Sequence, residues 1–263
     1  MTIAEKITKL DESADKLIEL NNDFEETLYG TSYGGKSYYD EFWDGNQKNG
    51  KRTDYAYSYS GFGWNNITFC PKYDITVTGG YGVFYYCQYK GSFKELLNRQ
   101  GITLTFPDVY NISNQFMYCE FTELGELDYS TARQAAPNGV FNNASKLHTI
   151  DKIILSNVVD FTFINWFQSC SALENITFEG EIRNSISFEW STKLTKDSIT
   201  NIINHLSDTV SGKTLTLSIT AVKNAFNGGT WDSDGDGKDD TIMASEEWVD
   251  LQDTIPNWTI TLV

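Results

Sequence analysis

The chain has 263 residues, in which 36 Asp and Glu stand against 20 Lys and Arg, so its formal net charge is −16. This length allows one large or two small domains, and a content of 40% hydrophobic and 14% aromatic residues is typical of a globular chain rather than a disordered one. Because the charge is acidic, no Lys/Arg cluster is present and no apolar run approaches ~18 residues, we expect neither a nucleic-acid partner nor membrane insertion.

Residues 1–30 carry a heptad pattern. Apolar or near-apolar residues follow one another in alternating steps of four and three, at Ile3, Ile7, Leu10, Ala14, Leu17, Asn21, Phe24 and Leu28. Half of the other positions are charged, which favours a helix that pairs with copies of itself in a coiled coil. A polar residue in the seam, here Asn21, is typical of a position that sets register and strand number. We expect a homotrimer. A dimer, or a single helix lying on its own domain, stays open.

Residues 31–90 are rich in aromatic residues and glycine. The glycines of residues 30–35 end the first helix, and the alternation in TDYAYSYSGFGW places three tyrosines on one face of an extended strand. This segment has two interpretations, a β-rich cap that packs on the next domain or a set of exposed rings that bind sugar or protein. We favour the packed cap.

The rest of the chain, residues 91–263, alternates helical and extended patterns. GSFKELLNRQG predicts a helix ended by Gly101, with the strand ITLTF after it. TKLTKDSITNIINHLSD predicts a second helix, with Thr195 as its N-cap and Ser211-Gly212 as its stop. KYDITVTG, KTLTLSI and NWTITLV read as strands.

A repeat runs through the middle of the chain. Leu124, Leu147, Leu173 and Leu194 stand 23, 26 and 21 residues apart, and an aromatic residue precedes each by six positions, at Tyr118, Phe141, Phe167 and Phe188. A period of about 20 to 29 residues is that of leucine-rich repeats, in which each unit adds one strand to a ladder. Coincidental spacing within an ordinary α/β domain is the alternative.

Together these patterns predict an α+β protein. An N-terminal coiled-coil helix (1–30) would be followed by an aromatic-rich cap (31–90) and a short leucine-rich-repeat solenoid (91–263) with an acidic insertion at 227–245.

Several segments resemble one family. FWDGNQKNGKRTDYAYSYSGFGWNNITFCPKYDI (42–75), IDKIILS (150–156), LTKDSITNIINHLSD and PNWTITL are similar to hypothetical leucine-rich-repeat proteins, of the bacterial-surface-antigen type, in bacteriophages and prophages of gut Firmicutes. The resemblance covers residues 38–263 apart from the insertion. It implies a virion-associated structural protein and names no catalytic residue.

The insertion contains half of a calcium loop. Oxygen ligands at positions 1, 3, 5, 7 and 9 would come from Asp232, Asp234, Asp236, the Lys238 carbonyl and Asp240, and Gly237 stands at the sharp turn. Position 12, where a bidentate Glu is expected, is Met243. We expect a structural Ca²⁺ site, with a solvated acidic turn as the alternative.

The other residue types with chemical potential give no catalytic pattern. The chain has two histidines, His148 and His205, and neither stands in a recognisable nucleophile motif. The cysteines Cys70, Cys87, Cys119 and Cys170 lack the spacing of a zinc site and are expected to be small buried thiols. We therefore expect no enzyme.

The function expected from the sequence is host attachment. A bacteriophage tail or head fibre, assembled in the host cytoplasm and located in the virion, would contact itself, other virion proteins and a host surface glycan or protein. A virion decoration protein without a receptor and a virion-associated glycan-degrading enzyme are the alternatives.

Overall fold

The computed structural model describes residues 32–33, 36–37, 74–79, 81–226 and 245–263. The chain divides into two compact units, Met1–Gly50 and Lys51–Val263. In the first unit the described residues form an antiparallel pair, β1 (Ser32–Tyr33) and β2 (Lys36–Ser37). The predicted coiled-coil positions, most of the aromatic cap and the predicted calcium loop lie outside the described residues.

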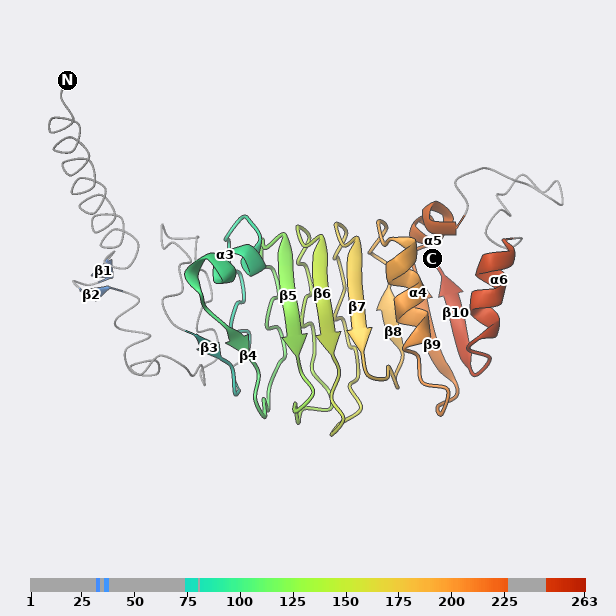
Figure 1. Ribbon diagram of the computed structural model, residues 1–263, viewed down its shortest axis with the longest axis horizontal. Helices are drawn as coiled ribbons and strands as arrows, with labels where there is room; N and C mark the ends of the chain where they lie inside the picture. The colour runs from blue at the N-terminus through green and yellow to red at the C-terminus, as the bar shows by residue number, and fades with distance from the viewer. Residues whose placement is uncertain (1–31, 34–35, 38–73, 80, 227–244) are drawn as a thin grey trace, which may run out of the picture. The chain divides into compact units, whose positions relative to one another are not determined.

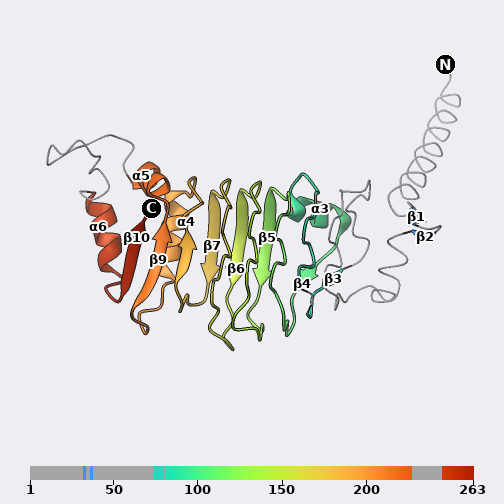
Figure 2. The same cartoon turned by 180° about the vertical axis from the view of Figure 1, so that it is seen from behind.

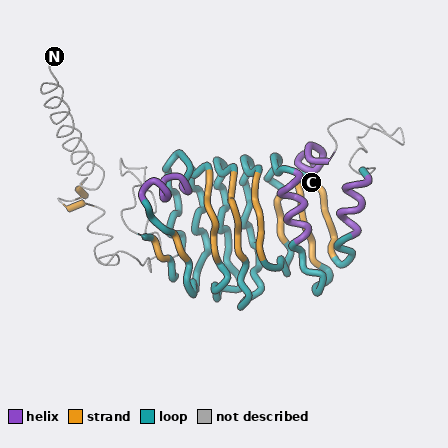
Figure 3. The backbone as a smooth tube through the Cα atoms, viewed as in Figure 1, coloured by secondary structure: helices purple, strands orange, loops and turns teal. Residues whose placement is uncertain are grey.

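The second unit is mixed α+β, with short strands joined by long loops (Figures 1 and 3). Its described helices are α3 (Phe93–Gln100), α4 (Lys196–Asn204), α5 (Ile219–Phe226) and α6 (Glu246–Asp253). Its described strands are β3 (Ile75–Thr76), β4 (Leu104–Thr105), β5 (Glu123–Asp128), β6 (Thr149–Ile154), β7 (Asn175–Glu179), β8 (Ile186–Phe188), β9 (Lys213–Leu217) and β10 (Trp258–Leu262).

All described strand pairs of this unit are parallel, and they form three separate sheets. These are the pair β3–β4, the sheet β5–β6–β7 and the sheet β10–β9–β8. Figure 1 shows β5 to β7 side by side between α3 and α4, and Figure 2 shows the sheet of β8 to β10 from behind.

The predicted leucine-rich-repeat solenoid is wrong. The described residues form separate parallel sheets with four helices instead of one continuous ladder. One of the two breaks comes after β7, where a further strand would pair and α4 lies instead. The backbone N–H groups of Ile176 and Phe178 in β7 donate to Ser198 Oγ at 3.0 Å and Asn201 Oδ1 at 2.7 Å. Polar side chains of a helix thus satisfy the edge that another repeat would have occupied.

The core is a stack of aromatic rings. Neighbouring rings are nearly parallel, with centroids 4.5 to 5.6 Å apart, along the row Phe84, Phe116, Phe141, Phe167 and Phe188. The first of the four predicted aromatic positions is displaced by two residues, because Phe116 and not Tyr118 belongs to this row. Offset or parallel aromatic pairs add about 0.5–1.5 kcal/mol each beyond the area they bury.

Four of the five rings sit in a tight turn that needs left-handed backbone. The four rings are Phe84, Phe116, Phe141 and Phe167. The residues two positions before them are Gly82, Asn114, Gly139 and Asn165, and the residues two positions after them are Tyr86, Tyr118, Asn143 and Ser169. All eight have φ between 54° and 60°. At Gly139 a Cβ would also lie 2.8 Å from Asn114 Oδ1. Glycine and asparagine adopt this conformation at the lowest cost, which explains their presence before the ring.

The two helices predicted within residues 91–263 are confirmed, one of them with a shifted end. Ser92 accepts from the N–H of Glu95 at the start of α3, and Gly101 ends it with φ 65°. Thr195 is the N-cap of α4 as expected. That helix ends at Asn204 with His205 as its C-cap, well before Ser211, since the chain must turn there to form a bridge between Leu206 and Ile182.

Candidate functional site

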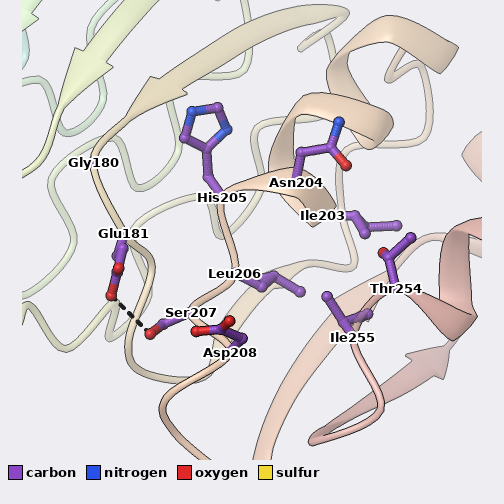
Figure 4. A pocket seen from close by; sticks show the side chains of 10 residues that line it. All are labelled: Gly180, Glu181, Ile203, Asn204, His205, Leu206, Ser207, Asp208, Thr254 and Ile255. Carbon is purple, nitrogen blue, oxygen red and sulfur yellow. Dashed lines mark hydrogen bonds between the residues drawn. The ribbon is translucent and has the colours of Figure 1, made fainter.

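A pocket of about 530 Å³ lies where the ends of three elements meet (Figure 4). It is lined by residues 180–181 after β7, residues 203–208 at the end of α4, and residues 254–255 after α6. This volume is within the range of small-molecule sites, about 300–1,000 Å³. The three segments are far apart in the sequence, so the pocket is a product of the tertiary structure.

Backbone bonds hold the first two segments together. The N–H of Ile182 donates to the His205 carbonyl at 2.7 Å, and the N–H of Ser207 donates to the Ile182 carbonyl at 2.9 Å. The third segment is held by Trp258, whose indole N–H donates to the Ser207 carbonyl at 2.9 Å in a buried contact. The rim of the pocket is therefore set by hydrogen bonds to the main chain.

Glu181 is the first of two carboxylates in the lining. Its Oε2 accepts from Ser207 Oγ at 2.7 Å, as Figure 4 shows, and from Arg183 NH1 at 2.9 Å. The Ser207 hydrogen bond, assisted by the Arg183 guanidinium, lowers the pKa of this carboxyl below its ordinary value. Arg183 in turn contacts Asp160 at 3.0 Å, so its charge is shared between two carboxylates.

Asp208 is the second carboxylate, and it is exposed. Its main-chain carbonyl accepts from Asn257 Nδ2 at 3.0 Å, which holds the residue at the pocket mouth. Among the described residues, no ion pair is formed by its side chain. A negative charge at the opening is thus without a counter-charge from the described part of the chain.

The serine and the histidine of the pocket make structural contacts. Ser207 is 2% exposed, and its hydroxyl is bound to Glu181 and lies 2.8 Å from Thr209 Oγ1. His205 Nδ1 lies 2.8 Å from the Asn201 carbonyl, and Figure 4 shows its ring pointing away from Ser207. The pair therefore lacks the hydrogen bond of a nucleophile and its base. The other histidine, His148, is half-exposed beside Glu174 at 3.5 Å.

The remaining lining is apolar or neutral. The side chains of Ile203, Leu206 and Ile255 are buried and form one wall, while Asn204 and Thr254 are exposed at the edge. The pocket consequently combines an apolar wall with carboxylates at its mouth, and sites for small molecules commonly combine apolar walls with a few polar groups in this way.

A smaller cavity of about 230 Å³ lies between α3 and β5. Beside it, ion pairs cross the outer face of the β5–β6–β7 sheet: Lys94 contacts Asp151 at 2.6 Å, and Lys152 contacts both Glu126 at 3.5 Å and Glu179 at 3.0 Å. Two lysines pair with three carboxylates here, so each of these carboxylates has a lysine partner, whereas Asp208 of the larger pocket has no ion pair among the described residues.

None of the predicted site residues is among the described residues that line this pocket. The predicted metal ligands Asp232, Asp234, Asp236, Lys238 and Asp240 and the oligomerisation residues of 1–30 lie outside the described residues. In the described part of the chain, no group of three or more His, Cys, Asp or Glu is placed to hold a metal ion. Sequence reasoning missed Glu181 and Asp208 because no local motif contains them.

The described cysteines agree with the prediction. Cys87, Cys119 and Cys170 are free and buried. Among the helices that the structure describes, none has the length and apolarity needed to cross a bilayer.

Comparison of the chain with protein-family models, with curated proteins and with solved structures finds no match.

Proposed function

We propose that the protein is a non-catalytic recognition protein of a bacteriophage virion that takes part in attachment to the host surface. The observation that carries the binding part is the pocket at the ends of α4 and α6, where Ser207 and His205 are engaged in structural hydrogen bonds and the carboxylates stand at the mouth. Such a site holds a ligand without supplying a nucleophile.

For the virion location, the proposal rests on the resemblance inferred from the sequence alone, in which residues 42–75, 150–156, 194–208 and 256–262 resemble proteins of phages and prophages of gut Firmicutes. A heptad seam in residues 1–30 would add the multivalency that attachment proteins exploit, since linked copies convert a weak site into strong overall binding.

The test is binding of the purified full-length protein, fluorescently labelled, to a panel of Firmicutes cells. We expect saturable binding to some strains and competition by unlabelled protein. Binding to none of the strains, together with presence of the protein in purified virions, would favour a decoration protein. Release of reducing sugars from cell-wall polysaccharide would instead favour an enzyme.

A further inference from the structure

The pocket of Figure 4 lies at the C-terminal ends of two helices. Residues 203–205 end α4 and residues 254–255 follow α6, so both helices direct their C-termini to the same cavity. A helix C-terminus carries about half a negative charge and favours cations. Neither α4 nor α6 has a Lys or Arg in its last turn to balance that charge, and at the C-cap of α4 the His205 Nδ1 lies 2.8 Å from the Asn201 carbonyl.

Two carboxylates add to this negative potential. Glu181 and Asp208 come from different segments and line the same cavity. Arg183 stands behind Glu181 and is shared with Asp160, and Asp208 has no ion pair among the described residues. The site therefore has a surplus of negative charge that its described surroundings leave unbalanced.

The cavity is too large for a bare ion and has one apolar wall. A volume of about 530 Å³ holds an organic molecule, and the buried side chains of Ile203, Leu206 and Ile255 would contact a hydrocarbon chain or ring. The side chains of Asn204 and Thr254 at the edge can bind a hydroxyl or carbonyl.

We propose that this pocket binds a primary organic ammonium group, with the ammonium between Glu181 and Asp208 and the carbon skeleton against the apolar wall. An ammonium offers three donors and no acceptor, which matches carboxylates and helix C-terminal carbonyls. The ligand chemistry is set by the pocket alone and is independent of where the protein acts.

The same chemistry is found on a lysine side chain and on an amino sugar. The test uses the full-length protein and isothermal titration with three ammonium probes, 1,5-diaminopentane, Nα-acetyl-lysine amide and glucosamine. Their matched neutral analogues are 1,5-pentanediol, Nα,Nε-diacetyl-lysine amide and N-acetylglucosamine. We expect saturable binding of at least one ammonium probe, none of its neutral analogue, and weakening by added salt. The preferred probe distinguishes the lysine-like source from the sugar.

Two variants locate the site. Asp208→Asn keeps the shape of an exposed side chain and is expected to weaken binding by at least about tenfold, since the ammonium loses a charged hydrogen-bond acceptor. The matched control, Asp197→Asn, removes an exposed carboxylate in the first turn of α4, at the opposite end of that helix. It should leave binding unchanged.

Three results would overturn the assignment: equal affinity of Asp208→Asn and wild type, equal losses in both variants, or binding of the neutral analogues as tight as that of the ammonium probes. Thermal unfolding of each variant without ligand checks that it is folded. If no ammonium probe binds, the ammonium proposal is wrong, but labelled protein can still bind to cells. The two experiments therefore test the two proposals separately.

Discussion

Single residues in the core repeat one local pattern: a phenylalanine, then a turn residue two positions later and a small residue directly after that. The small residues are Cys87, Cys119, Ala144, Cys170 and Ser191, and all are buried. The Cys170 thiol donates to the Phe141 carbonyl at 3.1 Å, and the Ser191 hydroxyl donates to the Cys170 carbonyl at 3.2 Å. The side chains of Cys170 and Ser191 thus link each turn to the main chain of the turn before it by hydrogen bonds.

The described thiols should be unreactive in the native protein. Burial raises the pKa of Cys119 to about 12 and that of Cys170 further, so no thiolate forms at pH 8. Treatment with iodoacetamide at pH 8, followed by peptide mass spectrometry, should show no labelling of Cys87, Cys119 or Cys170 without denaturant and full labelling in guanidinium. Fast labelling of Cys170 in the folded protein would contradict its position in the core.

Two glycines with similar φ should respond differently to alanine. At Gly101 (φ 65°) an added Cβ would meet open space, whereas at Gly139 (φ 60°) that atom would lie 2.8 Å from Asn114 Oδ1. Gly101→Ala should cost roughly 1–2 kcal/mol of unfolding free energy from the left-handed backbone alone. Gly139→Ala should cost more, because the Asn114 side chain must also move. Urea unfolding measures both, and equal losses would argue against the close approach.

At the scale of elements, a helix can end a sheet when its side chains supply the missing acceptors. Ser198 is 3% exposed, accepts from the N–H of Ile176 and donates to the Glu174 carbonyl at 3.1 Å. Ile199, Ile202 and Ile203 of the same helix are buried. The helix therefore serves both as an apolar layer and as the edge partner of β7.

Removing one of these acceptors should be costly. Ser198→Ala leaves the buried N–H of Ile176 without its acceptor, which should destabilise the protein by about 1–3 kcal/mol. Ser171→Ala, an exposed serine, should change the unfolding free energy by no more than about 0.5 kcal/mol. Thermal or urea unfolding compares the two, and similar small effects would mean that water or another group replaces Ser198.

The acidic segment 227–245 is an element-scale prediction from sequence. If Asp232, Asp234 and Asp236 bind Ca²⁺, calcium should raise the melting temperature and release heat in a titration. Asp234→Asn with Asp236→Asn should abolish both effects, and Mg²⁺ should be a weaker ligand. An unchanged melting temperature with no heat would show that this segment is a solvated acidic turn.

At the scale of the whole molecule, the seam of residues 1–30 governs the number of copies. Leu10→Asp with Leu17→Asp places charge in the predicted seam and should turn a trimer or dimer into a monomer. Lys9→Asp with Lys16→Asp, outside the seam, is the matched control and should keep the oligomer. Light scattering of the full-length proteins measures the mass. A wild-type monomer would contradict the coiled coil.

The sequence predicts local structure well where the determining interactions are local. Thr195 and Gly101 are recognisable as helix boundaries because capping depends on a few neighbouring residues. The repeat is visible in the sequence too, yet its spacing points to Tyr118 rather than Phe116. Both aromatic residues fit the period, and only packing decides which ring enters the core.

The sequence alone determines the excess of acidic over basic residues, the aromatic content and the helix boundaries at Thr195 and Gly101. The tertiary structure alone decided that the β5–β6–β7 sheet ends at β7, because this depends on Ser198 and Asn201 of α4 reaching the edge of that strand. The tertiary structure also decided which carboxylates lie together at one cavity. Glu181 and Asp208 are two of 36 acidic residues, and only the convergence of two helix ends and a bridged strand places them at one cavity, where their fields add.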